Sequence, residues 1–323
     1  MARIPAPPPP QPTTLPNNLP QPDSSNTTTT TTTASKDQHS QHPTIPSPKF
    51  LLQIHDLRHP GSHTFLTLIP DLASTLETAL TTILETLYTS PSPSPTSNQN
   101  PKPRPITFIP SLPPTRSVTT LLRPIPGVAY TTGTDLDPDH KEIHLSLSYI
   151  ENCTTRYADD PRAEIVGVLT HELVHCYQHT APPENEDTGP RPPGGLIEGI
   201  ADFVRLKAGL APPHWTRPRS AKERAEKWDQ GYQHTAYFLA WLEEVRVGRG
   251  AVGLVNDRLL RVGYLGEKAE GDGEERRSEG EDGSGKPGEG FWKALFGVGV
   301  EELWAEYGRY LDSLAGELEA EAK

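Results

Sequence analysis

The sequence predicts an α+β domain with disordered segments attached to it. Candidate strands lie mainly in the first half of the chain, and segments with helical spacing of apolar residues dominate the second half. Only 33% of the residues are apolar, a low fraction for a chain that is folded throughout. We therefore expect one ordinary core beside long unfolded segments. The candidate strands are residues 50–54, 63–69, 106–110, 128–132 and 142–150.

Two segments are too polar to fold. Residues 1–48 carry 12 of the 36 prolines and an unbroken threonine run at 27–33, and residues 266–290 hold nine acids, four bases and eight glycines. Such segments cannot bury enough apolar surface to offset the entropy lost on ordering. The predicted organisation is a disordered tail over 1–48, a domain over 49–314 with a disordered acidic insertion at 266–290, and a C-terminal tail over 315–323.

Charge and composition limit the partners. The formal net charge of -12 argues against nucleic acid and against anionic membrane surfaces, because both attract Lys and Arg. The chain has no run of about 18 apolar residues that would span a bilayer. The stretch PAPPPPQP at residues 5–12 is suited to an SH3- or WW-type partner domain, with a solvated tail as the plainer alternative.

The expected location is intracellular. A secretory signal needs an apolar stretch of roughly 7–15 residues near the N-terminus, and prolines occupy that place in MARIPAPPPPQP. The two cysteines, Cys153 and Cys176, do not make a disulfide framework, although one bridge between them is conceivable. Their number suits a reducing compartment such as the cytoplasm.

Two elements of the first half have clear patterns. Asp71 is placed to cap a helix that runs through Tyr88, because leucines and isoleucines recur behind it at helical spacing. Residues 142–150 alternate like a strand with one wet face. The apolar face holds Ile143, Leu145, Leu147 and Tyr149, and the polar face holds His144, Ser146 and Ser148.

A helix is predicted from Asp160 to about His179. Asp160 and Pro161 are a favourable start, a capping residue followed by a first-turn proline. The predicted buried stripe consists of Ile165, Val168, Leu169, Leu173 and Cys176.

The rest of the second half is also predicted to be helical. A helix over 196–208 should end at Gly209, which suits a left-handed cap. Another is expected over 228–247. The large apolar residues of 291–311 need a core, so this segment is expected to rejoin the domain.

The motif HELVH at residues 171–175 fits His-Glu-x-x-His. Two histidines four residues apart on a helix project from one face, so that both rings of His171 and His175 can reach one zinc ion. Glu172 is rotated by about 100° from His171 and can face a metal-activated water without being a ligand, as a general base requires. The alternative is an exposed charged helix face.

A carboxylate third ligand is expected from GGLIEGIADFVRL at residues 194–206. Glu198 would complete a two-histidine, one-glutamate site with a fourth position open. Asp202, four residues later on the same helix face, would accept the free N–H of a ligand histidine. His179 is the rival third ligand, but an unbroken helix places it about 12 Å along the axis from His171 and turned by about 80°.

Around and beyond these motifs the chain contains, in this order, the longer segments GVLTHELVHCYQH, GGLIEGIADFVRLKAGLAPPHW, WDQGYQHTAYFLAWLE and EELWAEYGRYL. Together they resemble the plant basic secretory protein family, a group of zincin peptidases. The resemblance spans about residues 50–314 without 266–290. It implies a thermolysin-like core with Glu198 as third ligand, and favours Gln178 over His179 as a motif position. Members are often secreted, and this chain differs by being acidic.

The predicted reaction is zinc-dependent hydrolysis of a peptide bond in a peptide or protein substrate. Glu172 would take the proton of the attacking water and deliver it to the leaving amine. Tyr232 is the first candidate to steady the oxyanion, with His234 and His214 behind it. The polar edge of strand 142–150 is expected to pair with the substrate backbone. Cys176 is expected in the core.

Two other functions fit the same residues. A zinc hydrolase of a non-peptide bond would use the same site, and cleavage of a broad peptide library separates the two. A binding protein could also keep the fold without turnover, with the proline-rich tail as its working part. The complete set of His171, Glu172, His175 and Glu198 argues against such a loss.

Overall fold

The computed structural model describes residues 47–91, 106–185, 189–265 and 290–321. All of them belong to one compact unit, residues 43–323. The predicted tail, apart from its last two residues, and the predicted insertion, apart from Gly290, lie outside the described residues. The same is true of the proline-rich stretch at 5–12.

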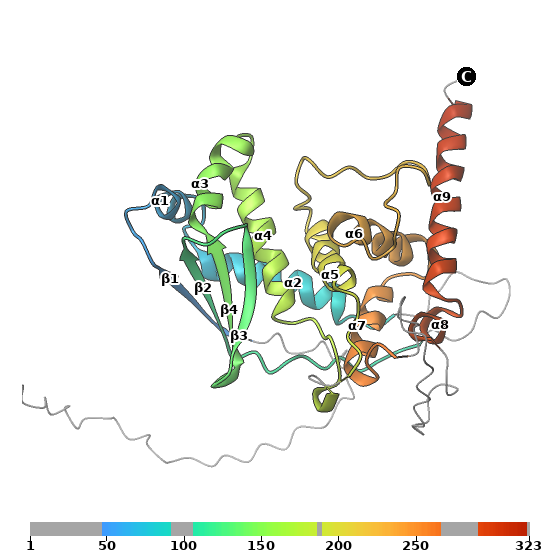
Figure 1. The fold of residues 1–323 in the computed structure, drawn as a ribbon, viewed down its shortest axis with the longest axis horizontal. Helices are drawn as coiled ribbons and strands as arrows, with labels where there is room; N and C mark the ends of the chain where they lie inside the picture. The colour runs from blue at the N-terminus through green and yellow to red at the C-terminus, as the bar shows by residue number, and fades with distance from the viewer. Residues whose placement is uncertain (1–46, 92–105, 186–188, 266–289, 322–323) are drawn as a thin grey trace, which may run out of the picture. The chain divides into compact units, whose positions relative to one another are not determined.

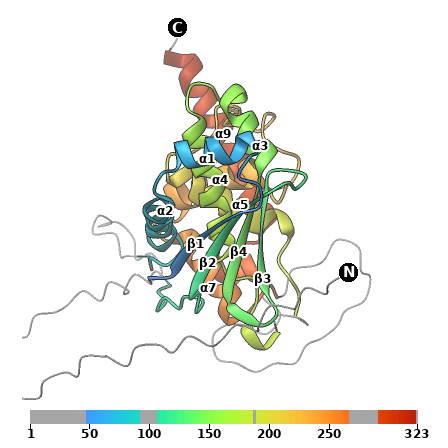
Figure 2. The same cartoon turned by 90° about the vertical axis from the view of Figure 1, so that its left-hand side faces the viewer.

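A mixed four-stranded sheet lies on one side of the domain (Figures 1 and 2). Its strands are β1 (Lys49–Ile54), β2 (Ser117–Arg123), β3 (Ala129–Thr134) and β4 (Asp137–Ser146). Their order is β1-β2-β4-β3, with β1, β2 and β4 parallel and β3 antiparallel to β4. The α+β class predicted from the sequence is therefore confirmed, and β3 forms an edge of the sheet.

Two of the predicted strands are wrong and one strand was missed. Residues 63–69 fall largely in helix α1 (Pro60–Leu68), which starts where the ring of His59 accepts the amide of Gly61 at 3.0 Å. Residues 106–110 form no regular element. The missed strand is β2, where only one residue at each end is not buried. A strand buried on both faces lacks the alternation that marks a half-exposed one.

The prediction for 142–150 holds only in part. The strand β4 ends at Ser146, whose hydroxyl accepts the amide of Tyr149 and caps the helix α3 (Leu147–Arg156). The supposedly wet face is buried at this end: His144 stacks on Tyr130 with 4.4 Å between ring centroids, and Ser146 donates to the carbonyl of Ile125 at 3.0 Å.

The capped helices begin where the sequence placed them. Helix α2 (Leu72–Leu87) has Asp71 as its N-cap, and α4 (Pro161–His175) has Asp160, whose carboxylate accepts the amide of Ala163 at 2.8 Å. The predicted stripe of α4 is buried. Burial is not limited to one face, however, because the helix packs against neighbours on several sides and every residue from 167 to 174 is buried. It ends at His175, four residues before the predicted end.

The remaining helices pack beyond α4, away from the sheet (Figure 1). As predicted, α5 (Gly194–Lys207) is followed by Gly209 with a positive φ of 73°. The predicted helix over 228–247 is α6 (Tyr232–Trp241), continued by a π-helical turn, Leu242–Arg246. Helix α7 (Ala251–Arg261) was not foreseen, and 291–311 rejoins the core as α8 (Phe291–Phe296) and the first half of α9 (Val300–Glu321).

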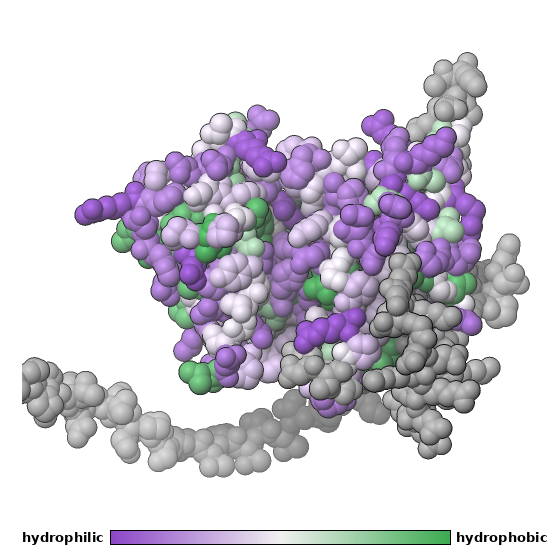
Figure 3. All heavy atoms as spheres, viewed as in Figure 1, coloured by the Kyte–Doolittle hydropathy of each residue, from purple (hydrophilic) through white to green (hydrophobic). Residues whose placement is uncertain are grey.

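Most of the surface on the face shown in Figure 3 is hydrophilic, with scattered apolar patches. In the part of the chain that the structure describes, no helix combines the length and the apolar character that a membrane span would need.

The start of α5 packs directly against the loop that leads into α6. A Cβ atom on Gly195 would lie 1.8 Å from the carbonyl oxygen of Asp229, whereas one on Gly194 would meet nothing within 4 Å. We expect Gly195→Ala to lower the free energy of unfolding by about 1–3 kcal/mol, because backbone must move. The matched variant Gly194→Ala should change it by less than about 1 kcal/mol. Urea unfolding of the two variants measures this, and equal stabilities would contradict the packing.

Candidate metal centre

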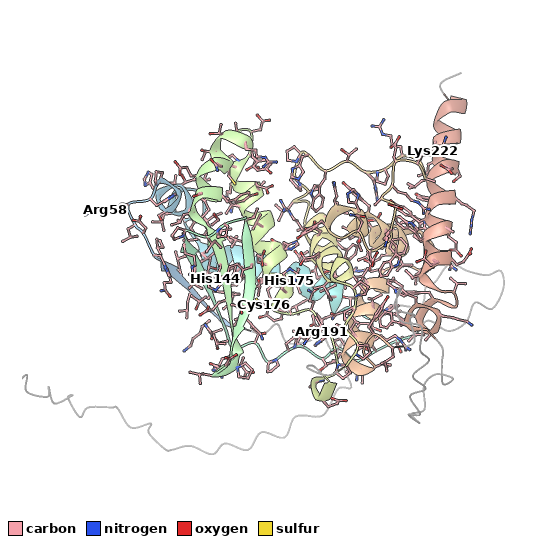
Figure 4. All side chains as sticks on the ribbon, viewed as in Figure 1. Arg58, His144, His175, Cys176, Arg191 and Lys222 are labelled. Carbon is pink, nitrogen blue, oxygen red and sulfur yellow. The ribbon has the colours of Figure 1, made fainter. Side chains whose placement is uncertain are left out.

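Three side chains from two helices converge on one point. His171 and His175 come from α4 and Glu198 comes from α5. The Nε2 atoms of the histidines are 3.2 Å apart, and the Glu198 Oε2 atom is 3.1 Å from the first and 3.8 Å from the second. Figure 4 places His175 on α4 in the middle of the domain. The i, i+4 spacing on a helix accounts for the histidine pair.

The three donor atoms have the spacing of a tetrahedral site. Zinc binds nitrogen and oxygen donors at about 2.0–2.2 Å, so two donors on a tetrahedron lie roughly 3.3–3.6 Å apart. The three distances between His171, His175 and Glu198 bracket this value. Two nitrogens and one carboxylate oxygen are a donor set that zinc accepts, so the residues fit the ion.

Asp202 lies behind His171, one helical turn beyond Glu198. Its buried carboxylate is 2.7 Å from Nδ1 of His171. A carboxylate there accepts the Nδ1–H, which leaves Nε2 free to face the donor group. The sequence predicted that Asp202, on the same helix face as Glu198, would contact a histidine of the motif. This contact, between Asp202 and His171, is present.

Gln178 makes the corresponding contact with His175. Its side-chain amide lies 2.7 Å from Nδ1 of His175, and its Oε1 atom is buried without a hydrogen-bond partner among the described residues. Turning the amide by 180° places the oxygen on Nδ1–H, the partner that a histidine needs when its Nε2 binds a metal. The sequence marked Gln178 only through the family resemblance, because the contact depends on how the chain turns after His175.

The pKa values of His171 and His175 are shifted in opposite directions. Burial lowers the pKa of His171, but hydrogen bonds to Asp202 and Glu198 outweigh it and raise the pKa to about 9. Burial, together with the charge on His171, lowers the pKa of His175 to about 4. Positive charge is therefore favoured on His171, which lies between the carboxylates of Asp202 and Glu198.

Glu172 lies beside the donor group rather than in it. Its carboxylate is buried, and the hydroxyl of Thr131 on β3 lies 2.7 Å from Oε2 and 2.9 Å from the backbone oxygen of the same residue. Burial raises the pKa of Glu172, while the charge of His171 and the contact with Thr131 lower it in part. A carboxylate with a raised pKa is a stronger base, so it is better suited to take a proton from a water beside the donor group. The sequence did not reveal the role of Thr131.

Tyr232 overlies the group from the start of α6. Its ring is stacked on that of His171 with 6.2 Å between centroids, and the side chain is 58% exposed. Tyr232 has a positive φ of 46°, unusual for a residue with a bulky side chain, and it follows Gly231 at 88°. The charge of Glu198, more than burial, raises the pKa of the phenol, which keeps it a hydrogen-bond donor.

The group opens into a cleft of about 1040 Å³. Tyr232, His234 and His214, the three candidates for oxyanion contact, all line it. The cleft is also lined by the first residues of the edge strand β3, 129–131, and by Val128 just before it.

His179 lies outside the donor group, but not for the predicted reason. The helix does end before it, without any glycine: the amide of Tyr177 makes a three-residue turn to the carbonyl of Val174, and the amide of His179 donates to the side chain of Asn256. The ring is buried elsewhere, with Nε2 2.8 Å from the carbonyl of Ser111 and 3.3 Å from the hydroxyl of Tyr88. His179 thus connects α2 to the segment before β2.

The two cysteines are free and buried. Cys176 is in the core, as predicted, and burial raises the pKa of both thiols. The conceivable bridge between Cys153 and Cys176 is not formed.

An α+β domain with His-Glu-x-x-His on one helix and a glutamate from the next helix facing the two histidines has the arrangement of the zincin class. A family model described as a peptidase of plants and bacteria matches residues 47–307. The chain belongs to this family, which confirms the resemblance seen in the sequence. No curated protein and no solved structure gives a significant match. Family and donor group together suggest a metallopeptidase.

Proposed function

We propose that the chain is a zinc-dependent peptidase whose metal is held by His171, His175 and Glu198. The observation that carries this is the spacing of the three donor atoms, 3.1, 3.2 and 3.8 Å, close to the edges of a zinc tetrahedron. A carboxylate with no part in the donor group, that of Glu172, lies next to it. The chain also belongs to a family of peptidases.

The residues around the metal have separable roles. When bound, zinc supplies a Lewis acid that polarises the scissile carbonyl and lowers the pKa of a water. Glu172 accepts the proton of the attacking water and passes it to the leaving amine. Thr131 holds the Glu172 carboxylate toward the cleft through the 2.7 Å contact. The phenol of Tyr232, which its raised pKa keeps protonated, donates a hydrogen bond to the oxyanion.

The substrate backbone is expected along β3. The earlier expectation named strand 142–150, but β4 lies between β2 and β3 and has no free edge. Strand β3 pairs only with β4 among the described strands and lines the cleft at residues 129–131. An extended peptide can add to such an edge through backbone hydrogen bonds. The contact between Thr131 and Glu172 then joins the binding strand to the base.

Metal analysis combined with peptide cleavage tests the proposal. Purified protein is expected to carry about one zinc per chain, and to lose and regain cleavage of a broad peptide library when zinc is removed and restored. Cleavage of an ester or amide library but of no peptide would indicate a non-peptide hydrolase. A protein that binds zinc and peptides without turnover would be the binding protein, and a protein without zinc would contradict the site itself.

A further inference from the structure

The backbone of β3 divides its hydrogen-bonding groups between β4 and the open edge of the sheet. The carbonyl of Val128 accepts the amide of the last β4 residue at 2.9 Å, and Tyr130, two residues further on, is paired with His144. In an antiparallel pair the backbone groups of alternate residues point the same way, so those of Val128 and Tyr130 point to β4. The backbone groups of Ala129 and Thr131 therefore point to the open edge, where an added peptide strand would bond to them.

The side chains of β3 alternate between the two faces of the sheet. Thr131 points toward α4, where its hydroxyl contacts Glu172. Tyr130, the residue before it, points to the opposite face, because successive side chains of a strand do so. Val128 shares that face with Tyr130, and both side chains are exposed, at 41% and 44%. The cleft edge therefore presents two apolar side chains on the face away from Glu172.

The ring of Tyr130 is stacked within the protein on one of its two faces. It lies nearly parallel to the ring of His144, with an angle of 9° between the planes and 4.4 Å between the centroids. This separation is close to the spacing of about 4.7–4.9 Å between neighbouring strands, so the rings stack along the direction that runs across the sheet. Since His144 comes from β4, the second face of the Tyr130 ring is turned to the open edge. In the described part of the chain, His144 is the one ring that stacks on Tyr130.

His144 is a fixed support for this ring. It lies in the sheet, on β4, and is only 4% exposed (Figure 4). Its Nδ1 atom is 3.2 Å from the guanidinium of Arg123, which can only donate, so Nδ1 accepts and the proton lies on Nε2. That Nε2–H donates to the carboxylate of Glu142 at 3.0 Å. Both ring nitrogens are therefore held, and the orientation of the Tyr130 ring is set before a substrate arrives.

We propose that Tyr130 selects substrates with an aromatic side chain on the residue that pairs with it across the edge of β3. Residues opposite one another in neighbouring strands have their side chains on the same face, so this residue would lay its ring on the second face of Tyr130. Thr131 contacts the proposed base, Glu172, at 2.7 Å, and strands advance about 3.3 Å per residue, so the selected residue lies within about three residues of the scissile bond. The inference rests on the proposed peptidase function, with the substrate along β3, and specifies its substrate class.

Peptide cleavage by the full-length, zinc-loaded protein tests the inference. Mass spectrometry of the products from a mixture with every amino acid at each position should show Phe, Tyr or Trp enriched at one position near the cleaved bond. Two peptides that differ only by Phe or Leu at that position separate ring stacking from apolar area. We expect kcat/KM to be roughly 2–10-fold higher for the Phe peptide, because an aromatic pair contributes this much beyond burial. Enrichment of charged residues there, or equal rates for Phe and Leu, would overturn the inference and leave the peptidase intact.

Variants of Tyr130 assign the preference to its ring. Tyr130→Ile removes the ring and keeps an apolar side chain with high strand propensity, so the Phe-to-Leu ratio of kcat/KM should fall to about one. The matched variant Tyr130→Phe keeps the ring and should keep the ratio. The ratio is the readout, since a loss of folding or of zinc lowers both rates equally. An unchanged ratio in Tyr130→Ile contradicts the assignment. If the unaltered protein cleaves no peptide at all, the proposed function fails and the inference fails with it.

Discussion

Replacing Glu198 with alanine is expected to weaken zinc binding by more than roughly 100-fold. The substitution removes one of three donor atoms, and it also removes the carboxylate that balances the charge of the metal. Asp202→Ala and Gln178→Met should each weaken binding about 10–100-fold, because their contacts at 2.7 Å orient the ligand rings without reaching the metal. His179→Ala should leave the affinity nearly unchanged.

Competition with a chromogenic chelator measures the four affinities on one scale. Gln178→Glu is the matched variant for Gln178→Met, since a carboxylate still accepts the Nδ1–H of His175 and should keep the affinity close to that of the unaltered protein. His179→Ala will cost stability, because the ring is buried against Tyr88 and Ser111, so thermal unfolding is followed in parallel. An affinity that falls most for His179→Ala would contradict the assignment of Glu198.

The convergence of His171, His175 and Glu198 was predictable because the spacings within each helix are local. HELVH puts two histidines on one helix face whatever surrounds them, and the spacing of Glu198 and Asp202 does the same on the next helix. The helix starts at Asp71 and Asp160 were also local, since a cap and its amide are three residues apart.

What could not be predicted depends on tertiary contacts. Residues 63–69 read as a strand because Thr, Phe, Leu and Ile have β propensity, yet Pro60 and the capping ring of His59 start a helix there. The end of α4 at His175 depends on a distant contact, because the amide of His179 donates to the side chain of Asn256 in α7, and no glycine marks this end in the sequence. The contact of Thr131 with Glu172 joins residues 41 positions apart, so only the sheet order reveals it.

The strand beside the His-Glu-x-x-His helix differs from the one that the sequence indicated. The sequence suggested that a wet strand before the metal helix would receive the substrate. The structure places β3 at the edge of the sheet that lines the cleft, and its residues were predicted only as an ordinary strand. An antiparallel edge strand beside the proposed base, Glu172, is a better platform for an extended peptide than an interior strand, because its backbone groups are available.

Replacing Glu172 with glutamine is expected to keep the zinc and to lower kcat roughly 10²–10⁴-fold. The carboxylate is not one of the three donor atoms, so the metal should stay at about one per chain. Glutamine has nearly the same shape, and its amide oxygen can still accept from the hydroxyl of Thr131, so the fold should persist. It cannot take a proton from water, and a lost general base typically costs this much.

The matched control is Glu243→Gln, because Glu243 is also a buried glutamate. Its carboxylate accepts the backbone amide of Val252. Glu243 does not line the cleft, so this variant should keep its cleavage rate even if it unfolds at a lower temperature. Zinc content by atomic absorption and steady-state cleavage of one library-derived peptide are measured on the unaltered protein and both variants. Loss of zinc from Glu172→Gln would make Glu172 a ligand or a structural residue. Full activity with full zinc would remove it from the reaction and leave the cleft without an assigned base.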